Sequence, residues 1–241
     1  MRGLLYKEFH QFKVDLYVLI GLMVLLFGIF VPTTAMMEAE DTEEFVRSAV
    51  MLSGLVYFLA LLLGSILCTE FFTKDEKRPW HSFAVSLPLG AKGQVQAKYY
   101  AVLLVHLMVL LVCFLADAVI VLLTGNVQCT AITVGVIVFC FRMLVMAFEI
   151  PFMFRFGAQI GTNVEGVVFA MIFMVGILYG LFGDISFFLQ ENVWKAFIEW
   201  MMSGKVIWVL ALFPYVTAVA YYVSYRISLK QYRKGVEYGE Q

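Results

Sequence analysis

Six long apolar segments constrain this chain more than any other feature. Roughly 20 mainly apolar residues in a helix cross the hydrocarbon core of a bilayer, which is about 30 Å thick. The chain is 62% hydrophobic and only 15% charged, so we predict an all-α integral membrane protein with six transmembrane helices. We expect the first helix to continue through Pro32 to Met37. The predicted spans are Leu16–Val31, Ala49–Cys68, Tyr99–Leu123, Ala131–Ile150, Val164–Phe182 and Val206–Val223.

The distribution of basic residues predicts the orientation. With the N-terminus inside, thirteen of the 17 Lys and Arg residues fall in cytoplasmic segments and three in outer segments. Cytoplasmic segments of membrane proteins carry such an excess. Both termini are therefore expected in the cytoplasm. Residues 1–15 mix apolar and charged side chains at helical spacing, which predicts a short amphipathic helix in the membrane interface.

Two segments outside the spans are unusual. The polar interval Thr69–Lys98 cannot lie in lipid, because each charged residue near a helix centre costs about 2.5–3.5 kcal/mol there. We predict a cytoplasmic loop. Residues 183–205, on the outer side, are too interrupted to cross the bilayer and too apolar for open solvent. An interfacial or re-entrant hairpin satisfies both facts.

Four ionisable residues lie inside the predicted spans. His106 and Asp117 share one stripe of the third span, and Arg142 and Glu149 share one stripe of the fourth. A short turn between these spans would put His106 level with Glu149, and Asp117 within reach of Arg142. Charged residues in lipid must pair or face water. They are either structural clamps between the two helices or part of a polar pathway, and the sequence leaves both open.

Other motifs are weaker. Gly176 and Gly180, four residues apart in the fifth span, are candidates for close helix packing within the subunit or across a dimer. The four cysteines lie in or at the ends of apolar runs without C-x-x-C spacing, so we predict neither disulfides nor a metal site. The acidic outer loop contains Glu43-Glu44-x-x-Arg47, which has some likeness to the signature of intramembrane CAAX-type proteases. That signature has one more intervening residue and accompanying histidines, so no catalytic residue is assigned.

One resemblance covers essentially the whole chain. It is carried by three segments: Glu76–Pro88 (EKRPWHSFAVSLP), Val95–Tyr99 (VQAKY) and the second cytoplasmic turn, Pro151–Gly157. Together with the N-terminal helix, the six spans and the outer hairpin, these resemble the permease subunits of type-2 ABC exporters. That family includes small bacterial permeases that export amphipathic or antimicrobial peptides.

The resemblance implies a translocation subunit in the bacterial cytoplasmic membrane, paired with a second permease subunit that is identical or closely related. It also implies a separate nucleotide-binding ATPase that holds ATP and Mg²⁺, because the chain has no G-x-x-x-x-G-K-[ST] loop of its own. No cofactor in this chain and no nucleic-acid partner are expected. The alternative is a non-transporting scaffold or sensor that recruits an ATPase.

The resemblance also assigns contact residues. In the family, the loop after the second span forms a coupling helix that sits in a groove of the ATPase. Apolar anchors in such a helix would contribute more binding energy than the charges around them. The ATPase-coupling candidates are Lys77, Arg78, Trp80, His81, Phe83 and Val85, and those of the second turn are Phe154, Arg155 and Gly157.

Overall fold

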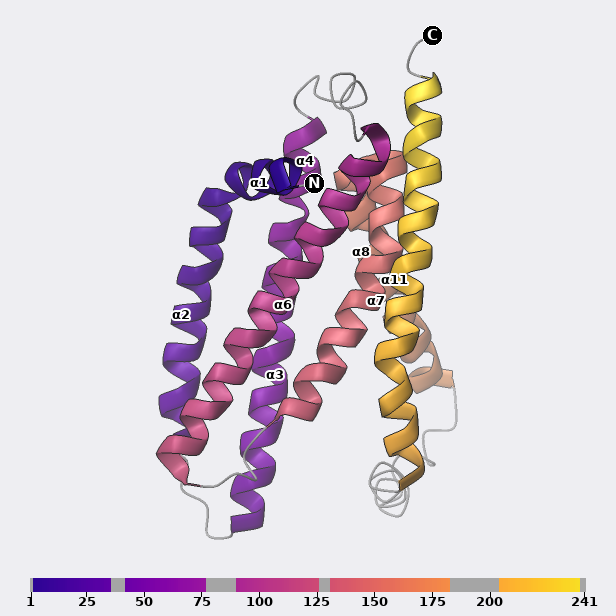
Figure 1. Cartoon of the computed structure of the whole chain (residues 1–241). Helices are drawn as coiled ribbons and strands as arrows, with labels where there is room; N and C mark the ends of the chain where they lie inside the picture. The colour runs from indigo at the N-terminus through magenta and orange to yellow at the C-terminus, as the bar shows by residue number, and fades with distance from the viewer. Residues whose placement is uncertain (1, 36–41, 77–89, 126–130, 183–203, 239–241) are drawn as a thin grey trace.

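The computed structural model describes residues 2–35, 42–76, 90–125, 131–182 and 204–238. These residues are helical almost throughout. Six long helices run alternately up and down in one bundle, and a short helix lies across one end of it (Figure 1). The helices are α1 (Arg2–Gln11), α2 (Lys13–Ala35), α3 (Thr42–Cys68), α4 (Glu70–Glu76), α6 (Gly90–Thr124), α7 (Ile132–Phe156), α8 (Ala158–Phe182) and α11 (Gly204–Tyr238).

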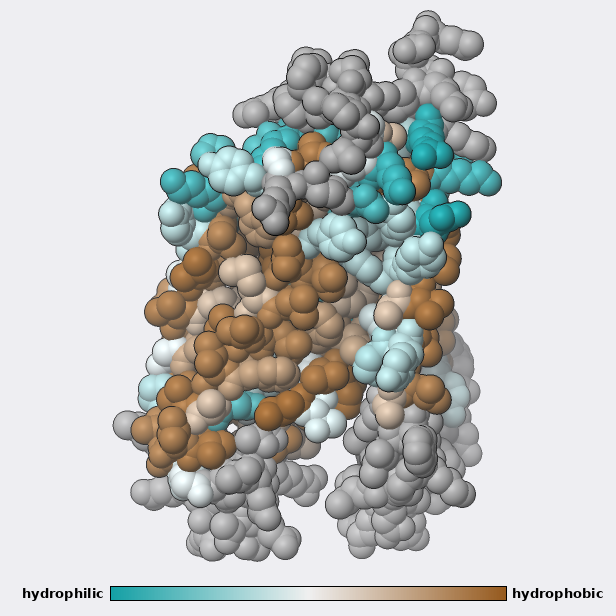
Figure 2. Space-filling view, viewed as in Figure 1, coloured by the Kyte–Doolittle hydropathy of each residue, from teal (hydrophilic) through white to brown (hydrophobic). Residues whose placement is uncertain are grey.

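Within the described residues, four helical stretches are long and apolar enough to cross a membrane: Lys13–Thr34, Ala49–Lys74 (α3 with the start of α4), Gly90–Thr124 and Ile132–Phe156. Their outward faces stay apolar; Leu122, for example, is 83% exposed. Figure 2 shows a broad hydrophobic surface along the bundle, with hydrophilic side chains gathered at its upper end. A surface of this kind is far larger than the apolar patches of soluble monomers and fits a lipid surrounding. The chain is therefore a multi-pass membrane protein.

The remaining two predicted spans, Val164–Phe182 and Val206–Val223, fall within the long helices α8 and α11. The predicted outer hairpin lies almost wholly outside the described residues. Helix α2 continues past Pro32 to Ala35, as expected. Near its end, the Phe30 carbonyl accepts hydrogen bonds from the Thr33 hydroxyl at 2.8 Å and from the Thr34 hydroxyl at 2.9 Å.

Several predicted boundaries need correction. Helix α3 begins at Thr42, before Ala49, and α11 continues past Val223 to Tyr238. The third long helix begins at Gly90, so residues 90–98 belong to α6 and not to a loop. The fourth helix does not end before Pro151 but continues through it to Phe156. A proline inside a membrane helix is tolerated where neighbouring helices cover the freed carbonyl. The N-terminal helix is shorter than expected and ends at Gln11, and Phe12 forms the turn into α2.

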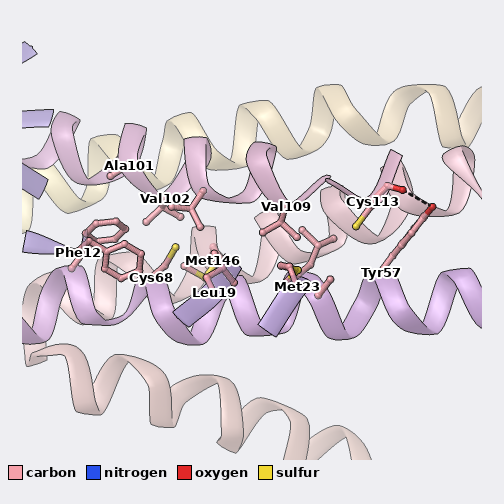
Figure 3. Packing of buried hydrophobic residues seen from close by; sticks show 14 of the residues in the cluster. Phe12, Leu19, Met23, Tyr57, Cys68, Ala101, Val102, Val109, Cys113 and Met146 are labelled. Atoms are coloured by element: carbon pink, nitrogen blue, oxygen red, sulfur yellow. Dashed lines mark hydrogen bonds between the residues drawn. The ribbon is translucent and has the colours of Figure 1, made fainter. Parts of the chain in front are cut away.

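We call the upper end of the bundle in Figure 1 the α1 end. Helix α1, the end of α4, the start of α6, the junction of α7 with α8, and the end of α11 all lie there. Below them runs one apolar core between α2, α3, α6 and α7. Leu19 and Met23 face Val102 and Val109 across it, with Met146 beside them (Figure 3). Cys68 and Cys113 are buried in this core and Cys140 is buried on α7, which agrees with the prediction of small core residues.

Candidate functional site: two buried polar clusters

The first cluster lies at the α1 end, where Lys98 of α6 points into the space between α1 and α4. Its Nζ lies 3.7 Å from Glu8 Oε2, donates a hydrogen bond to the Phe71 carbonyl, and lies 4.8 Å from the centroid of the Phe72 ring. Lys98 is only 5% exposed and Glu8 is fully buried. Charges buried this deeply need partners of this kind. We call Glu8, Phe71, Phe72 and Lys98 the latch.

A row of aromatic rings extends the latch across the bundle. Phe12 stacks on Phe71 with ring centroids 4.1 Å apart. Phe72 meets Phe154 edge to face at 5.3 Å, and Phe154 meets Tyr232 in the same way at 5.7 Å. Aromatic pairs favour such edge-to-face geometry. The row (Phe12, Phe71, Phe72, Phe154 and Tyr232) therefore joins α4, α7 and α11 to the turn that follows α1.

A second ion pair fixes α4 from the other side. Lys74 Nζ pairs with the Asp15 carboxylate and donates a 3.2 Å hydrogen bond to the Gln11 carbonyl. It also lies 5.8 Å from the centroid of the Phe12 ring. These contacts reach the junction of α1 and α2. Helix α4 is too short to be stable alone, so its position depends on them.

The predicted second turn, Pro151–Gly157, is helical as far as Phe156, and the chain turns only at Gly157. Phe154 belongs to the aromatic row, whereas Arg155 is exposed, with its guanidinium 4.9 Å from the centroid of the Phe156 ring. Gly157 has φ 93°, which side-chain-bearing residues rarely adopt, and it separates α7 from α8. Its N–H bonds to the Met153 carbonyl at 3.0 Å.

The predicted ATPase-coupling residues lie outside the described residues: Lys77, Arg78, Trp80, His81, Phe83 and Val85. The structure describes the chain up to both ends of this segment, at Glu76 of α4 and Gly90 of α6. Both helices belong to the latch. We refer to residues 77–89 as the coupling segment.

The second cluster lies deeper, between α3, α6 and α7. Arg142 Nε donates a 2.5 Å hydrogen bond to Ser65 Oγ, and Arg142 Nη2 lies 3.6 Å from Glu149 Oε1. Ser65 Oγ is 2.7 Å from His106 Nε2, and His106 Nδ1 is 2.8 Å from the Val102 carbonyl. All four polar side chains are buried. We call Ser65, His106, Arg142 and Glu149 the polar cluster.

The Val102 carbonyl determines which nitrogen of His106 carries a hydrogen. A backbone carbonyl only accepts, so the His106 Nδ1 carries the hydrogen that meets Val102. In the singly protonated ring, Nε2 then accepts from the Ser65 hydroxyl, which also lies 3.0 Å from the Leu61 carbonyl. The Ser65 hydroxyl can donate to one of these two acceptors at a time. The polar contacts that were expected between two helices therefore join three.

The expected pairing of Asp117 with Arg142 is wrong. Asp117 Oδ2 accepts a 3.0 Å hydrogen bond from the N–H of Ala131, at the start of α7. Tyr57, beside Asp117, donates to the Cys113 carbonyl at 3.1 Å (Figure 3). Eleven residues of helix separate Ala131 from Arg142, a rise of about 16 Å. The Arg142 cation meets Glu149 on its own helix instead, two turns further along.

Sequence reasoning placed His106, Arg142 and Glu149 together but missed Ser65, Glu8 and Phe71. A hydroxyl in the middle of an apolar span is the signal that could have indicated Ser65, because such residues often bond between membrane helices. Glu8 gave a weaker signal in a short helix with other charges. The Phe71 contribution is a backbone carbonyl, which no residue pattern identifies.

The predicted packing glycines make no such cluster. Gly176 is exposed, and nothing in the described part of the chain lies within 4 Å of the position that a Cβ would take. The surroundings of Gly180 lie outside the described residues. A role of these glycines across a dimer stays a prediction.

Comparison with known proteins identifies the family. The family model described as ABC-2 family transporter protein matches residues 3–233, nearly the whole chain. No curated protein and no solved structure matches significantly. The match includes the latch, the aromatic row and the polar cluster. It supports a membrane transport component rather than an enzyme, and it implies an ABC ATPase as partner. The chain belongs to the ABC-2 transporter family.

Proposed function

We propose that this chain is the membrane-spanning subunit of an ATP-driven exporter, and that its substrate is amphipathic or lipophilic, of the peptide class. Six helices cross the bacterial cytoplasmic membrane with both termini in the cytoplasm. A separate ATPase subunit supplies the energy. Two permease subunits, identical or closely related, enclose the path between them. The α1 end is the cytoplasmic end in this proposal.

The observation that carries the proposal is the latch. Helix α4 ends and helix α6 begins at the two ends of the coupling segment. Both are fastened to the bundle by polar contacts, which are buried at Lys98 and partly exposed at Lys74. A loop at a membrane surface needs no such fastening. A segment that transmits force from an ATPase needs such contacts. Without them, its movement would bend only the adjoining helix ends and would not reach the rest of the bundle.

The same contacts supply a route for this force. ATP-driven closure of the ATPases would press on the coupling segment and displace α4 and the start of α6. The Lys98–Glu8 pair would carry that displacement to α1. The aromatic row would carry it through Phe154 to α7 and through Tyr232 to α11. Packed helices have low compressibility, so they move together as a unit.

The exposed side chains of α8 are evidence for a second permease subunit in this proposal. Its described side chains from Gly166 to Tyr179 are exposed almost throughout and include Val167, Met171 and Met174. Methionine side chains adapt to varied apolar shapes, so this face suits either a partner helix or an amphipathic cargo. We place the substrate path between the two subunits, along α2 and α8.

The test uses the chain together with its ATPase in proteoliposomes, with ATP hydrolysis and peptide export measured side by side. Trp80→Ala removes the main apolar anchor of the coupling segment, and Lys98→Met breaks the latch. Each should lower peptide-stimulated ATP hydrolysis and export about tenfold or more, because hot-spot anchors contribute at least about 2 kcal/mol. Membrane insertion of the Trp80→Ala variant should not change.

Lys13→Met is the matched control, because Lys13 is an exposed lysine near the α1 end that takes no part in the latch. It should leave both activities intact. Normal export by the Trp80→Ala variant would overturn the coupling assignment. If the wild-type chain binds and stimulates its ATPase but moves no peptide, it is a non-transporting scaffold or sensor.

A further inference from the structure

A cavity of about 380 Å³ opens between α6, α7 and α11, away from both polar clusters. Its walls are almost entirely apolar and aromatic. Residues from all three helices line it, including Tyr99, Phe139, Met143, Thr217, Ala218 and Tyr222. Its volume falls within the range of about 300–1,000 Å³ that small-molecule sites occupy.

The α6–α11 wall of this cavity is fixed by hydrogen bonds. The Tyr99 hydroxyl lies 2.7 Å from Ser224 Oγ and 2.8 Å from Ser228 Oγ. In return, the Tyr221 hydroxyl donates to the Tyr99 carbonyl at 2.7 Å. Side chains of α6 and of α11 each hydrogen-bond to the other helix. Because these bonds hold the two helices together without a ligand, the cavity is preformed. A ligand would not have to separate the helices to enter.

A basic groove of about 890 Å³ adjoins the cavity on the side of the α1 end. The two share Gln96, Tyr222 and Tyr225, so they form one continuous site. Four exposed cations line the groove: Lys92, Arg226, Lys230 and Arg233. No acidic residue lines it in the described part of the chain. Figure 2 shows hydrophilic side chains at this level around α11, above the hydrophobic belt.

The boundary between the two parts is polar. The Tyr225 hydroxyl lies there beside the Gln96 side chain, with which it interacts. Both side chains lie where an apolar ligand portion would meet an anionic one.

The dimensions of the combined site match one leaflet of a bilayer. From Thr217, which lines the cavity, to Lys230, which lines the groove, α11 rises by about 20 Å. Half of a bilayer with its headgroups measures about 20–22 Å. A ligand that filled both parts would thus have an apolar portion at the depth of acyl chains and an anionic portion at the depth of phosphates.

We propose that this site binds an anionic phospholipid from the leaflet at the α1 end, with one acyl chain in the cavity and the headgroup phosphate among Lys92, Arg226, Lys230 and Arg233. Clusters of Lys and Arg beside a membrane helix attract anionic headgroups. The apolar cavity directly below distinguishes this site from a general basic surface, because a free phosphate or an acidic protein would leave it empty. The site does not depend on the proposed export activity.

The test is native mass spectrometry of the purified, delipidated full chain. It is titrated in detergent with phosphatidylglycerol or with phosphatidylcholine of the same acyl chains, and separately with inorganic phosphate. We expect phosphatidylglycerol to bind about tenfold more tightly than phosphatidylcholine, as headgroup charge contributes most of the difference. Inorganic phosphate should not displace the bound phosphatidylglycerol.

Two variants separate the parts of the site. Arg226→Gln combined with Lys230→Gln should bring the two lipids to within about twofold of each other, because two headgroup cations are lost. Ala218→Phe fills the cavity and should weaken both lipids by about tenfold. The matched controls are Arg155→Gln, an exposed arginine at the same end, and Ala211→Phe, an exposed alanine on the same helix; neither residue lines the site.

Three results would overturn the proposal. The first is equal affinity of the wild-type chain for the two lipids. The second is full displacement of phosphatidylglycerol by inorganic phosphate, which would indicate a simple anion site. The third is loss of ATPase binding in the Arg226→Gln and Lys230→Gln variant with unchanged lipid preference, which would make the groove a protein-docking surface. Thermal unfolding of each variant checks that it is folded.

Discussion

The ammonium group of Lys98 on α6 lies 3.7 Å from the carboxylate of Glu8 on α1, with both side chains almost completely removed from solvent. This pair connects the short helix at the end of the bundle to the start of the third long helix. It lies beside the Phe71 carbonyl and the Phe72 ring. Several consequences can be measured.

Breaking the latch should destabilise the protein strongly. Lys98→Met removes the buried cation beside the Glu8 carboxylate and leaves Lys7, whose Nζ lies 3.4 Å from Glu8 Oε1. Removal of one partner of a buried pair costs about 3–5 kcal/mol. We expect a large fall in the thermal unfolding midpoint in detergent. The reactivity of the buried thiols of Cys68 and Cys113 toward a fluorescent maleimide reports unfolding. Lys98→Met together with Glu8→Leu should recover much of the loss, and no recovery would argue against the pairing.

The polar cluster predicts different roles for two serines on the same helix. Ser53 and Ser65 are both buried, and each hydroxyl bonds to the carbonyl four residues earlier, but only Ser65 also contacts Arg142 and His106. Ser65→Ala should lower the free energy of unfolding by about 1–3 kcal/mol, because it removes a partner from two buried polar groups. Ser53→Ala is the matched control and should cost less than about 1 kcal/mol. Equal effects would show that the interhelical bonds contribute nothing.

Gly161 is a third test, because it packs against the end of α7. A Cβ at this position would fall 2.2 Å from Met153 Cγ and 2.9 Å from the Met153 backbone nitrogen. Gly161→Ala should therefore lower the free energy of unfolding by about 1–3 kcal/mol through overpacking. Met153→Ala in the same chain should relieve only part of the clash, since the backbone contact remains.

Gly166 on the same helix provides the control for that substitution. Nothing in the described part of the chain lies within 4 Å of a Cβ built there. Gly166→Ala should be neutral or stabilising by up to about 1 kcal/mol, because alanine is the better helix former. Strong destabilisation by Gly166→Ala in the isolated protomer would contradict this description of α8.

Adjacent tyrosines on α6 give a fourth comparison. Tyr99→Phe removes the hydroxyl between Ser224 and Ser228 and should lower the free energy of unfolding by about 1–2 kcal/mol. Tyr100 is exposed on the same helix, and Tyr100→Phe should change it by less than about 0.5 kcal/mol. The two variants are compared by unfolding in mixed micelles. A larger effect at Tyr100 would contradict the assignment of Tyr99 as the link between α6 and α11.

The sequence predicted the helical class, the approximate positions of the long helices and the separate behaviour of residues 1–15, because apolar run length and charge placement are local properties of the chain. It also brought Arg142 and Glu149 to one stripe, since a seven-residue separation fixes their relative angle on a helix. His106 joined them correctly. The family resemblance was confirmed at the level of the ABC-2 transporters.

Other features depended on the packing of helices against one another. The partner of Asp117 could not be predicted from a hairpin drawn with ideal geometry, because the offset between α6 and α7 is set by contacts with α3. The sequence placed Lys98 in a solvated loop. In the structure it is buried, because Glu8 of α1 and the Phe71 carbonyl of α4 provide its polar partners. Helical periodicity determines which side chains share a face. Only the tertiary structure decides which face of a distant helix lies opposite. The latch, the polar cluster around Ser65 and the cavity between α6, α7 and α11 all result from that packing.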